Sequence, residues 1–341
     1  MWQVVGHDHV VAYLEKSLKK NALSHAYLFT GPKHIGKTTV AIALAQAVNC
    51  QNKNKPCGDC SSCLRIAAEA HPDVQVIRRL SADAAEDGKA KSELVIEQIR
   101  SIQRSASLPP YEGLSRVYIF EQAELLNEAA ANCLLKTLEE PHQNVLLILL
   151  APSLGAVPET IASRCQHLAF RRVPAGGIEG LLIKRGQPPD QAAFLASLSG
   201  GAPGWALMAI DNEEVLSRKT ERIEKLYELI NQDYEERFAI AEELAGKGPQ
   251  GRDETAEIIE DWQYLWRDLL LLKAGCATAI EGLGADRVGA LSQHLSISDI
   301  RDFLEKLVRA RELIERNVNP RLIIETLMLE MPLLDKTRLK G

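Results

Sequence analysis

Two patterns of apolar residues divide the chain before about Gly176 into strands and helices. Short apolar runs without regular alternation predict strands that are buried on both faces. Longer segments with apolar residues at helical spacing predict helices between them. The predicted strands are residues 25–30, 73–77, 116–120 and 144–151, and the predicted helices are residues 8–20, 38–50, 93–107 and 127–141. Strands that alternate with helices predict an α/β fold with a parallel sheet.

The pattern changes at about Gly176, after which no strand-like run follows. Residues 177–186 and 190–210 predict a small helical lid, and nearly everything from residue 212 onward is helical. Apolar residues at helical spacing there predict a bundle that buries its own core. A chain of 341 residues is long for one core. We therefore expect three domains, namely residues 1–172, 173–210 and 211–341, and a loop over the polar, aperiodic residues 81–92.

The composition is that of an ordinary soluble globular protein, with 46% hydrophobic and 25% charged residues. The longest apolar run, within 144–151, is too short to span a membrane. The first residues lack the basic flank and long apolar core of a secretion signal. We therefore expect a cytoplasmic protein with no membrane partner. The formal net charge of −6 argues against binding nucleic acid by bulk electrostatics, so contacts to DNA would be few and local.

A glycine-rich segment, GPKHIGKTT, joins the first predicted strand to the next helix. It matches the pattern G-x-x-x-x-G-K-[ST], in which backbone N–H groups wrap phosphates, the lysine reaches the outer phosphates and the hydroxyl binds magnesium. The helix that follows adds a favourable dipole for an anion. The sequence therefore predicts a site for ATP or ADP with magnesium, with the ligands Gly31, Gly36, Lys37, Thr38 and Thr39.

Four of the seven cysteines lie in a short insert, residues 50–71, that follows this helix. Two overlapping C-x-x-C turns and one more cysteine at the end of the helix supply four thiolates, which is the ligand set of a structural zinc. The predicted zinc ligands are Cys50, Cys57, Cys60 and Cys63. Disulfide bonds are the alternative, which a reducing compartment disfavours. The other cysteines are expected to be buried and inert, and they are Cys133, Cys165 and Cys276.

Five segments in this order suggest one family. They are residues 4–39, the four-cysteine insert, residues 127–151 (NEAAANCLLKTLEEPHQNVLLILLA), residues 160–170 (TIASRCQHLAF) and residues 319–331 (NPRLIIETLMLEM). Together they resemble the bacterial clamp-loader subunits of the AAA+ class, within the DNA polymerase III holoenzyme. The resemblance implies an AAA+ parallel-sheet core with a zinc-binding insert, a small helical lid and an all-α C-terminal collar domain that holds a ring of subunits together.

The family contains motor subunits, which hydrolyse ATP, and a delta-prime subunit, which does not drive the cycle. Aligning RVYIFEQAE with the motors puts Glu121 at the place of the aspartate that helps hold magnesium, and Gln122 at the place of the glutamate that polarises the attacking water. Glu121 can still reach magnesium through water, but Gln122 cannot accept a proton, and such a carboxylate is typically worth a factor of ~10²–10⁴. The polar sensor falls on Ala151 and the lid arginine on Gly204. These positions favour the delta-prime kind of subunit.

The segment SRC, residues 163–165, matches the arginine-finger motif of the family. The resemblance gives Arg164 a role in trans, beside the γ-phosphate held by a neighbouring subunit. It implies a stator in a five-membered ring with motor (gamma/tau) and delta subunits, which opens the sliding clamp and releases it around primed DNA. The chain would then be a non-catalytic or weakly active ATPase subunit of the polymerase holoenzyme, and not the polymerase itself.

Two alternatives stay open at this point. The first is an ATP-hydrolysing motor of the gamma/tau kind in the same loader, which the intact phosphate-loop pattern allows. The second is another phosphate-loop protein, such as a helicase loader or a repair ATPase, against which the cysteine insert and the LLKTLEEP helix argue.

Overall fold

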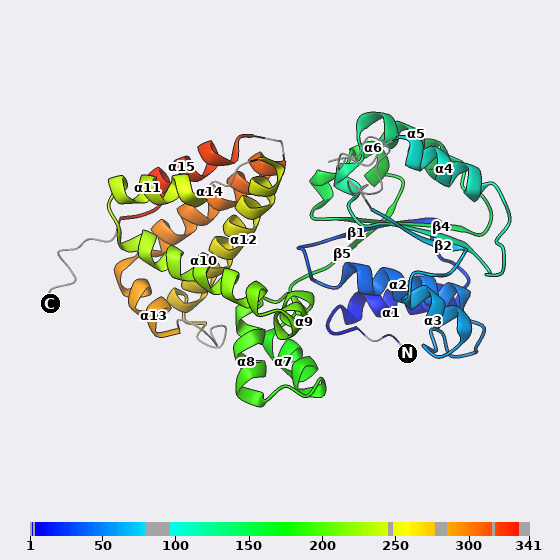
Figure 1. Cartoon of the computed structure of the whole chain (residues 1–341), viewed down its shortest axis with the longest axis horizontal. Coiled ribbons are helices and arrows are strands. Elements are labelled where there is room, and N and C mark those ends of the chain that lie inside the picture. The colour runs from blue at the N-terminus through cyan, green and yellow to red at the C-terminus, as the bar shows by residue number, and fades with distance from the viewer. Residues whose placement is uncertain are drawn as a thin grey trace. The chain divides into compact units, whose positions relative to one another are not determined.

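The computed structural model describes residues 2, 4–78, 96–244, 248–276, 285–315 and 318–333, so the predicted loop at 81–92 lies outside the described residues. The chain divides into two compact units (Figure 1). We call them the sheet unit, residues 1–177 with 201–204, and the helical unit, residues 178–200 with 205–341. The division into domains at residues 172 and 210 stays a prediction.

The sheet unit contains all the strands that the structure describes. They are β1 (Ala26–Thr30), β2 (Val74–Ile77), β3 (Arg116–Phe120), β4 (Val145–Ala151) and β5 (Gln166–Ala169). Its helices are α1 (Asp8–Lys19), α2 (Lys37–Asn49), α3 (Ser61–Ala67), α4 (Ile96–Ala106), α5 (Glu128–Glu139) and α6 (Glu159–Ala162), with the 3₁₀ turns η2 (Ala123–Leu125) and η3 (Leu154–Ala156).

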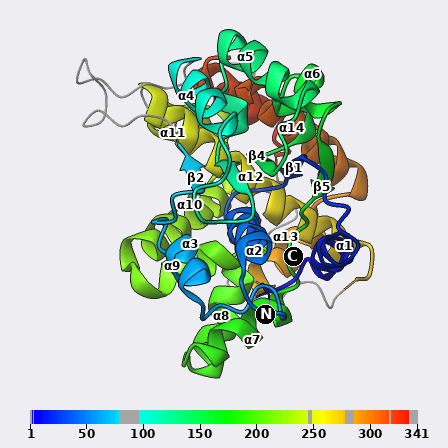
Figure 2. The ribbon, with the colours of Figure 1, turned by 90° about the vertical axis from the view of Figure 1, so that its right-hand side faces the viewer.

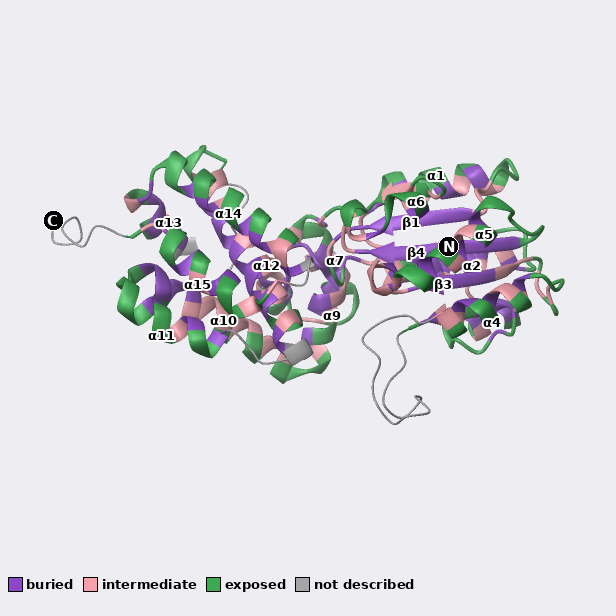
Figure 3. Cartoon of the chain, turned by 90° about the horizontal axis from the view of Figure 1, so that it is seen from above, coloured by how far each residue is buried: buried purple, intermediate pink, exposed green. Residues whose placement is uncertain are grey.

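The five strands form one parallel sheet in the order β2-β3-β4-β1-β5. Every residue of β1 and β4 is buried, as Figure 3 shows by their colour. The four strands predicted from the sequence and the parallel α/β core are confirmed. Strand β5 carries no apolar run that would predict it, because its four residues are exposed or only partly buried and two of them are polar.

Helices cover both faces of the sheet, with α4, α5 and α6 on one face and α1, α2 and α3 on the other (Figures 1 and 2). The side chains of β1 alternate between these layers. Ala26 and Leu28 pack in the cluster that includes α4 and α5, whereas Tyr27 and Phe29 pack with α1 and α2. Because both faces are covered, the strand is apolar on both sides and lacks the alternation of a half-exposed strand.

The order of the strands determines where a ligand can bind. β4 lies between β1 and β3, and the connections that leave β1 and β4 run toward opposite sides of the sheet. In parallel α/β sheets, ligands bind outside the carboxyl ends of the strands at such a switch point. The residues that directly follow β1, β3 and β4 therefore form the edge where a nucleotide site is expected.

A buried aspartate fixes the loop that precedes β3. The Asp73 side chain is 0% exposed, and its carboxylate accepts backbone hydrogen bonds from Tyr111 (2.7 Å), Glu112 (2.9 Å) and Gly113 (2.8 Å). Burial alone would raise the pKa of Asp73, but these three N–H donors and the charge of Arg116 outweigh it and hold the pKa below its ordinary value. The loop is thereby tied to the residue that leads into β2.

From α7 onward every described element is a helix, as the sequence predicts. These helices are α7 (Ala175–Lys184), α8 (Pro189–Leu198), α9 (Pro203–Asp211), α10 (Glu213–Asn231), α11 (Tyr234–Leu244), α12 (Gly248–Lys273), α13 (Ala285–His294), α14 (Ile297–Glu315) and α15 (Pro320–Glu330). In the described parts of the chain, no helix has the length and apolar character needed to cross a membrane.

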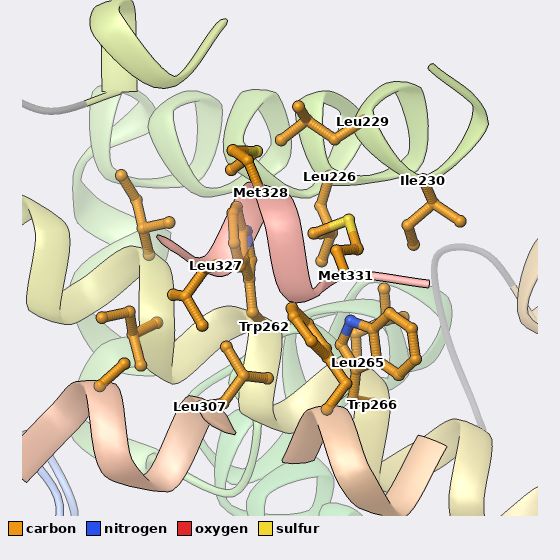
Figure 4. Packing of buried hydrophobic residues seen from close by; sticks show 14 of the residues in the cluster. Leu226, Leu229, Ile230, Trp262, Leu265, Trp266, Leu307, Leu327, Met328 and Met331 are labelled. Carbon is orange, nitrogen blue, oxygen red and sulfur yellow. The ribbon is translucent and has the colours of Figure 1, made fainter. Parts of the chain in front are cut away.

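Helix α12 forms the centre of the helical unit and packs against α10, α13, α14 and α15. Its two tryptophans lie inside the core (Figure 4). Trp262 is 2% exposed, and the ring of Trp266 lies 4.6 Å from the ring of Phe303, measured between centroids. The predicted bundle with its own core is confirmed for α10 to α15.

One buried arginine joins two helix ends in this unit. Arg237 of α11 is fully buried, and its guanidinium donates to the carbonyl oxygens of Leu229 and Ile230 at the end of α10. It also donates to Met331 (2.7 Å) and Pro332 (2.9 Å), just after α15. The last carbonyls of a helix lack partners within the helix, so this one side chain satisfies two helix ends at once.

Candidate functional site

The phosphate loop follows β1 at the expected edge of the sheet. Gly31 has a φ of 152°, and a Cβ there would lie 2.6 Å from the carbonyl oxygen of Phe170, so no other residue fits. Gly36 has a φ of 108° and forms the N-cap of α2. Because the N-cap residue Gly36 offers no side-chain cap, it leaves the first N–H groups of α2 for an anion, as a phosphate site requires.

The predicted phosphate ligands therefore meet at one place. The structure has Gly31, Gly36 and Lys37 around the turn, and Thr38 and Thr39 in the first turn of α2. The Lys37 ammonium lies along the loop and donates to the carbonyl oxygens of Gly31 and Pro32. This arrangement can bind phosphate through backbone N–H groups, a lysine and a hydroxyl.

A buried histidine, His7, supports the phosphate loop, and no sequence pattern predicts this role. The His7 ring donates from Nε2 to the carbonyl oxygen of Ile35 at 2.8 Å, and it packs against Phe170 with the ring centroids 4.8 Å apart. Burial lowers the pKa of His7, and the bond to Ile35 opposes that shift only in part. The neutral ring is thus held against the backbone of the loop. Nothing in the local pattern around His7 distinguishes it from an exposed histidine at a helix start.

The residues after β3 lie on the same edge of the sheet. Glu121, the predicted magnesium-site acid, is partly buried and is bound by Arg78, which follows β2. The Arg78 guanidinium donates to both carboxylate oxygens of Glu121, at 2.8 and 3.0 Å, and to both oxygens of Glu69, at 2.6 and 2.7 Å. The bonds from Arg78 lower the pKa of Glu69, and the two carboxylates raise the pKa of Arg78.

This arrangement does not fit the magnesium site of a motor subunit. A magnesium ion of this class is held by the hydroxyl of the phosphate loop and a carboxylate after the third strand. Here both oxygens of that carboxylate are occupied by a cation of the chain itself, and the next side chain, Gln122, is an amide without a negative charge.

Two further positions lie beside the phosphate loop. Ala151 ends β4, and its carbonyl oxygen accepts the N–H of Gly31 at 3.2 Å. Its methyl side chain offers no polar group at this position. The N–H of Gly204 donates to the carbonyl oxygen of His34 at 2.8 Å. A Cβ on Gly204 would lie 2.8 Å from that oxygen, which is closer than real Cβ atoms approach. The backbone of the phosphate loop therefore occupies the space that a side chain at residue 204 would need.

The four cysteines of the insert form one cluster. Their Sγ atoms all lie within 4.8 Å of one another, and those of Cys57 and Cys63 are 3.8 Å apart. Four sulfurs at about 2.3 Å from one zinc ion in a tetrahedron are about 3.8 Å apart, so the geometry of the thiols fits a zinc ion. The four residues are Cys50, Cys57, Cys60 and Cys63.

Local structure explains why these thiols converge. Cys50 directly follows α2 as its C-cap, and Cys60 caps α3 with its sulfur, which accepts the N–H of Cys63. The sulfur of Cys57 accepts the N–H of Cys60 at 3.3 Å. Backbone N–H groups of Cys60 and Asp59 lower the pKa of Cys57 to about 6, whereas burial raises the pKa of Cys63 to about 12. Such N–H donors orient and stabilise thiolate ligands.

All seven cysteines lie in the described residues, and all are free thiols, so the disulfide alternative is not supported. The expectation that the other three are buried is wrong for Cys276, which is exposed after the end of α12. Cys133 and Cys165 are only partly buried. The thiol of Cys133 donates to Gln103 at 3.0 Å, and burial raises the pKa of Cys165 to about 12. The sequence near a cysteine does not show whether neighbouring elements cover its side chain, so the exposure of these three residues could not be predicted.

Arg164, the predicted arginine finger, lies on the opposite edge of the sheet from the phosphate loop. It follows α6 and precedes β5, whose Gln166 pairs with Tyr27 near the start of β1. Because the two strands are parallel and rise about 3.3 Å per residue, Arg164 and the loop after β1 are separated by roughly 15 Å along the strands. The Arg164 side chain is 37% exposed and forms an ion pair with Glu139.

The parallel five-stranded sheet, the phosphate loop and the all-helical second unit define a member of the AAA+ class. A family model described as "DNA polymerase III, delta subunit" matches residues 6–174. The chain belongs to the clamp-loader subunits of DNA polymerase III.

Relatives of two kinds match at the same level. The chain is 28% identical over 351 residues to DNA polymerase III subunit tau of Bacillus subtilis (strain 168), which covers 96% of this chain and 60% of the relative. It is also 28% identical over 324 residues to subunit delta' of the same organism, with 94% of both chains covered. The chain thus spans about 60% of the length of the tau relative. These similarities give the family and do not separate the two kinds of subunit.

Among solved structures, a DNA polymerase III gamma-subunit-related protein from Thermotoga maritima covers 93% of this chain and 97% of its own length. The sequence identity is 18% and the TM-score is 0.39.

Proposed function

We propose that this chain is the stator, or delta-prime, subunit of a bacterial clamp loader. In this function its phosphate loop binds ATP or ADP without driving a hydrolysis cycle. Its Arg164 completes the ATP site of an adjacent motor subunit, and its four-cysteine insert holds a structural zinc ion. The partners are motor (gamma/tau) and delta subunits in a hetero-pentameric ring, which acts on the sliding clamp and primed DNA.

The observation that carries this proposal is the placement of Arg164. The arginine lies at the amino edge of the sheet, and the phosphate loop lies at the carboxyl edge. A side chain cannot span the roughly 15 Å between these edges within one rigid sheet. An arginine finger at this position can therefore act only on a phosphate that another subunit holds, where such a group is worth a factor of about 10³–10⁵ in rate.

The proposal of a non-hydrolysing site rests on the residues after β3. Gln122 stands where a motor needs a water-polarising carboxylate, and Glu121 is bound by Arg78. Ala151 and Gly204 lack the polar and cationic side chains that motors place beside the γ-phosphate, and a side chain at residue 204 would meet His34. The site retains the groups that bind phosphate and lacks those that activate water.

The runner-up is an ATP-hydrolysing motor of the gamma/tau kind. The complete set of phosphate-loop residues and the match to tau over 96% of this chain favour it. It requires that Glu121 leaves Arg78 and that some group other than Gln122 polarises water.

ATP turnover by the purified chain, at saturating ATP and magnesium, separates the two functions. The control is Lys37→Ala, which removes the phosphate-binding ammonium. We expect no turnover above this control while ADP still binds to the wild type. Turnover that depends on Lys37 would make the chain a motor.

The role of Arg164 needs the assembled loader. In a loader reconstituted with the other subunits of the same complex, we expect Arg164→Ala to lower the ATP turnover of the adjacent site by about 10³-fold. The matched control is Arg104→Ala, which removes an exposed arginine of α4 in the same unit. An equal effect of the two substitutions would overturn the role in trans.

A further inference from the structure

We propose that Arg78 replaces magnesium at the acid after β3, so that the phosphate loop binds nucleotide without a divalent cation. The inference deepens the proposed function and rests on its nucleotide site. It goes beyond the loss of hydrolysis, because it concerns how the site neutralises charge when nucleotide is bound.

The register of the sheet forces Arg78 and Glu121 together. In the parallel pair of β2 and β3, Ile77 is opposite Phe120. The N–H of Glu121 also donates to the carbonyl oxygen of Ile77 at 3.1 Å, so the pairing continues past the ends of both strands. The next residue of each strand is therefore at the same level, and side chains at the same level of neighbouring strands point to the same face.

The contact uses the full hydrogen-bonding geometry of both groups. Arg78 donates from Nε and Nη2 to the two oxygens of Glu121, and from Nη1 and Nη2 to the two oxygens of Glu69. Paired, parallel N–H···O bonds between arginine and a carboxylate are the strong and directional form of this interaction. The Glu121 side chain is only 23% exposed, which reduces the competition from water.

The second carboxylate keeps the guanidinium in place. Glu69 lies at a turn after α3 with a φ of 53°, and it accepts from Nη1 and Nη2 of Arg78, whereas Glu121 accepts from Nε and Nη2. A magnesium ion would have to displace an arginine held by two acids. Magnesium binds proteins through only one or two carboxylates and keeps several waters, so the displacement offers it little.

Charge at the phosphates is then neutralised by groups of the loop itself. These are the ammonium of Lys37, the first N–H groups of α2 and the positive end of the helix dipole. None of them depends on a metal ion. The affinity for nucleotide is therefore set by the loop and is insensitive to magnesium.

Three variants test this chain of reasoning. Arg78→Met removes the guanidinium and keeps a long side chain, which frees the carboxylate of Glu121. The double variant Arg78→Met with Glu121→Gln also removes the carboxylate that magnesium would use. Arg65→Met is the matched control, because Arg65 is a similarly exposed arginine of the same unit whose ion pair is with Glu112.

The measurement is the affinity for ADP by isothermal titration calorimetry, in excess magnesium and in excess EDTA. For the wild type and Arg65→Met we expect the two dissociation constants to agree within about twofold. For Arg78→Met we expect ADP to bind about tenfold more tightly with magnesium than with EDTA, and we expect the double variant to lose that gain.

The outcomes distinguish this inference from the function on which it rests. A wild type that binds ADP about tenfold more tightly with magnesium would overturn the inference and leave the nucleotide site intact. The inference also falls if Arg78→Met, folded by circular dichroism, gains no dependence on magnesium, or if Arg65→Met gains the same dependence. A wild type that binds no ADP under either condition would reject the nucleotide site itself, and the inference with it.

Discussion

The Nη2 atom of Arg164 lies 2.7 Å from the Oε1 atom of Glu139, the last residue of α5. A second nitrogen of the same guanidinium donates to the carbonyl oxygen of Thr160 at 2.9 Å. The proposed finger therefore has partners in its own subunit. To reach a phosphate on a neighbour, the side chain must leave Glu139.

Removal of that partner should favour the engaged position of the finger. Exposed ion pairs contribute about 0–1 kcal/mol, so Glu139→Gln should leave the stability of the chain nearly unchanged. In the reconstituted loader we expect ATP turnover to rise by up to about fivefold, which is the rate equivalent of that energy. The steady-state turnover of loaders with wild-type and variant chains measures this. A fall in turnover would instead make Glu139 a residue that positions the finger.

The four-cysteine insert should bind one zinc ion independently of the phosphate loop. Metal analysis of freshly purified protein should give about one zinc per chain, and Cys60→Ser should lose most of it because a tetrahedral site needs its fourth thiolate. We expect the affinity of Cys60→Ser for ADP to equal that of the wild type. Cys133→Ser, outside the cluster, is the control and should retain the metal. A wild type without zinc would contradict the assignment.

The Asp73 carboxylate should make the free energy of unfolding decrease at low pH. Its pKa is lowered in the folded state, so its contribution is fully present above the unfolded pKa of about 3.9 and is lost as pH falls through the lower, folded pKa. Asp73→Asn places an amide donor among three N–H donors and should cost about 2–4 kcal/mol in the free energy of unfolding at pH 7. Urea unfolding at pH 7 and below pH 4 measures both effects.

The difference in the free energy of unfolding between Asp73→Asn and the wild type should become smaller as the pH falls. The control is Glu140→Gln, which removes an exposed carboxylate at the end of α5 and should be nearly neutral at both pH values. A gap that stays constant with pH would mean that the charge of Asp73 contributes nothing and that only its shape matters.

Residue 204 should tolerate no side chain. Gly204→Ala brings a Cβ to 2.8 Å from the carbonyl oxygen of His34, so the segment 201–204 or the phosphate loop has to move. We expect a loss of about 1–3 kcal/mol in the free energy of unfolding and weaker binding of ADP. Gly180→Ala in α7 meets no atom within 4 Å and serves as the control. Equal behaviour of the two variants in both assays would show that the contact at His34 is unimportant.

Arg237 should be essential for the helical unit. Arg237→Met removes the side-chain donor to the carbonyl oxygens of Ile230, Met331 and Pro332, which should cost about 3–5 kcal/mol in the free energy of unfolding. Trp262 and Trp266 lie in the same core, so their fluorescence reports the unfolding of this unit. The control is Arg218→Met, at a side chain that is 68% exposed, which should change the midpoint of urea unfolding little. An unchanged midpoint for Arg237→Met would show that water replaces the guanidinium without cost.

What could be read from the sequence is what lies close together along the chain. The phosphate loop and the four-cysteine insert each place their chemistry within a few residues, so their patterns predict a site without knowledge of the fold. Strands buried on both faces are apolar throughout and were predicted for the same reason. The edge strand β5, which is half exposed, carries no such signal.

The contacts that the sequence could not predict depend on pairing between segments that are distant along the chain. Arg78 meets Glu121 only because β2 and β3 are neighbours in a particular register, although the two residues are 43 positions apart. Arg237 reaches Met331 across 94 positions. Charged residues are common after strands and within helices, so nothing in the sequence distinguishes these from solvated side chains.

The pairing of β1 with β5 has a mechanical consequence. These two neighbouring strands carry the phosphate loop at one end and Arg164 at the other, and their backbones are hydrogen-bonded along the whole of β5. The strand pair is thus a short rigid element with the phosphate loop at one end and Arg164 at the other. In the proposed function, a rigid tilt of this strand pair about its middle displaces the phosphate loop and Arg164 in opposite directions, so a displacement at the nucleotide of this subunit reaches the neighbour's site with its direction reversed.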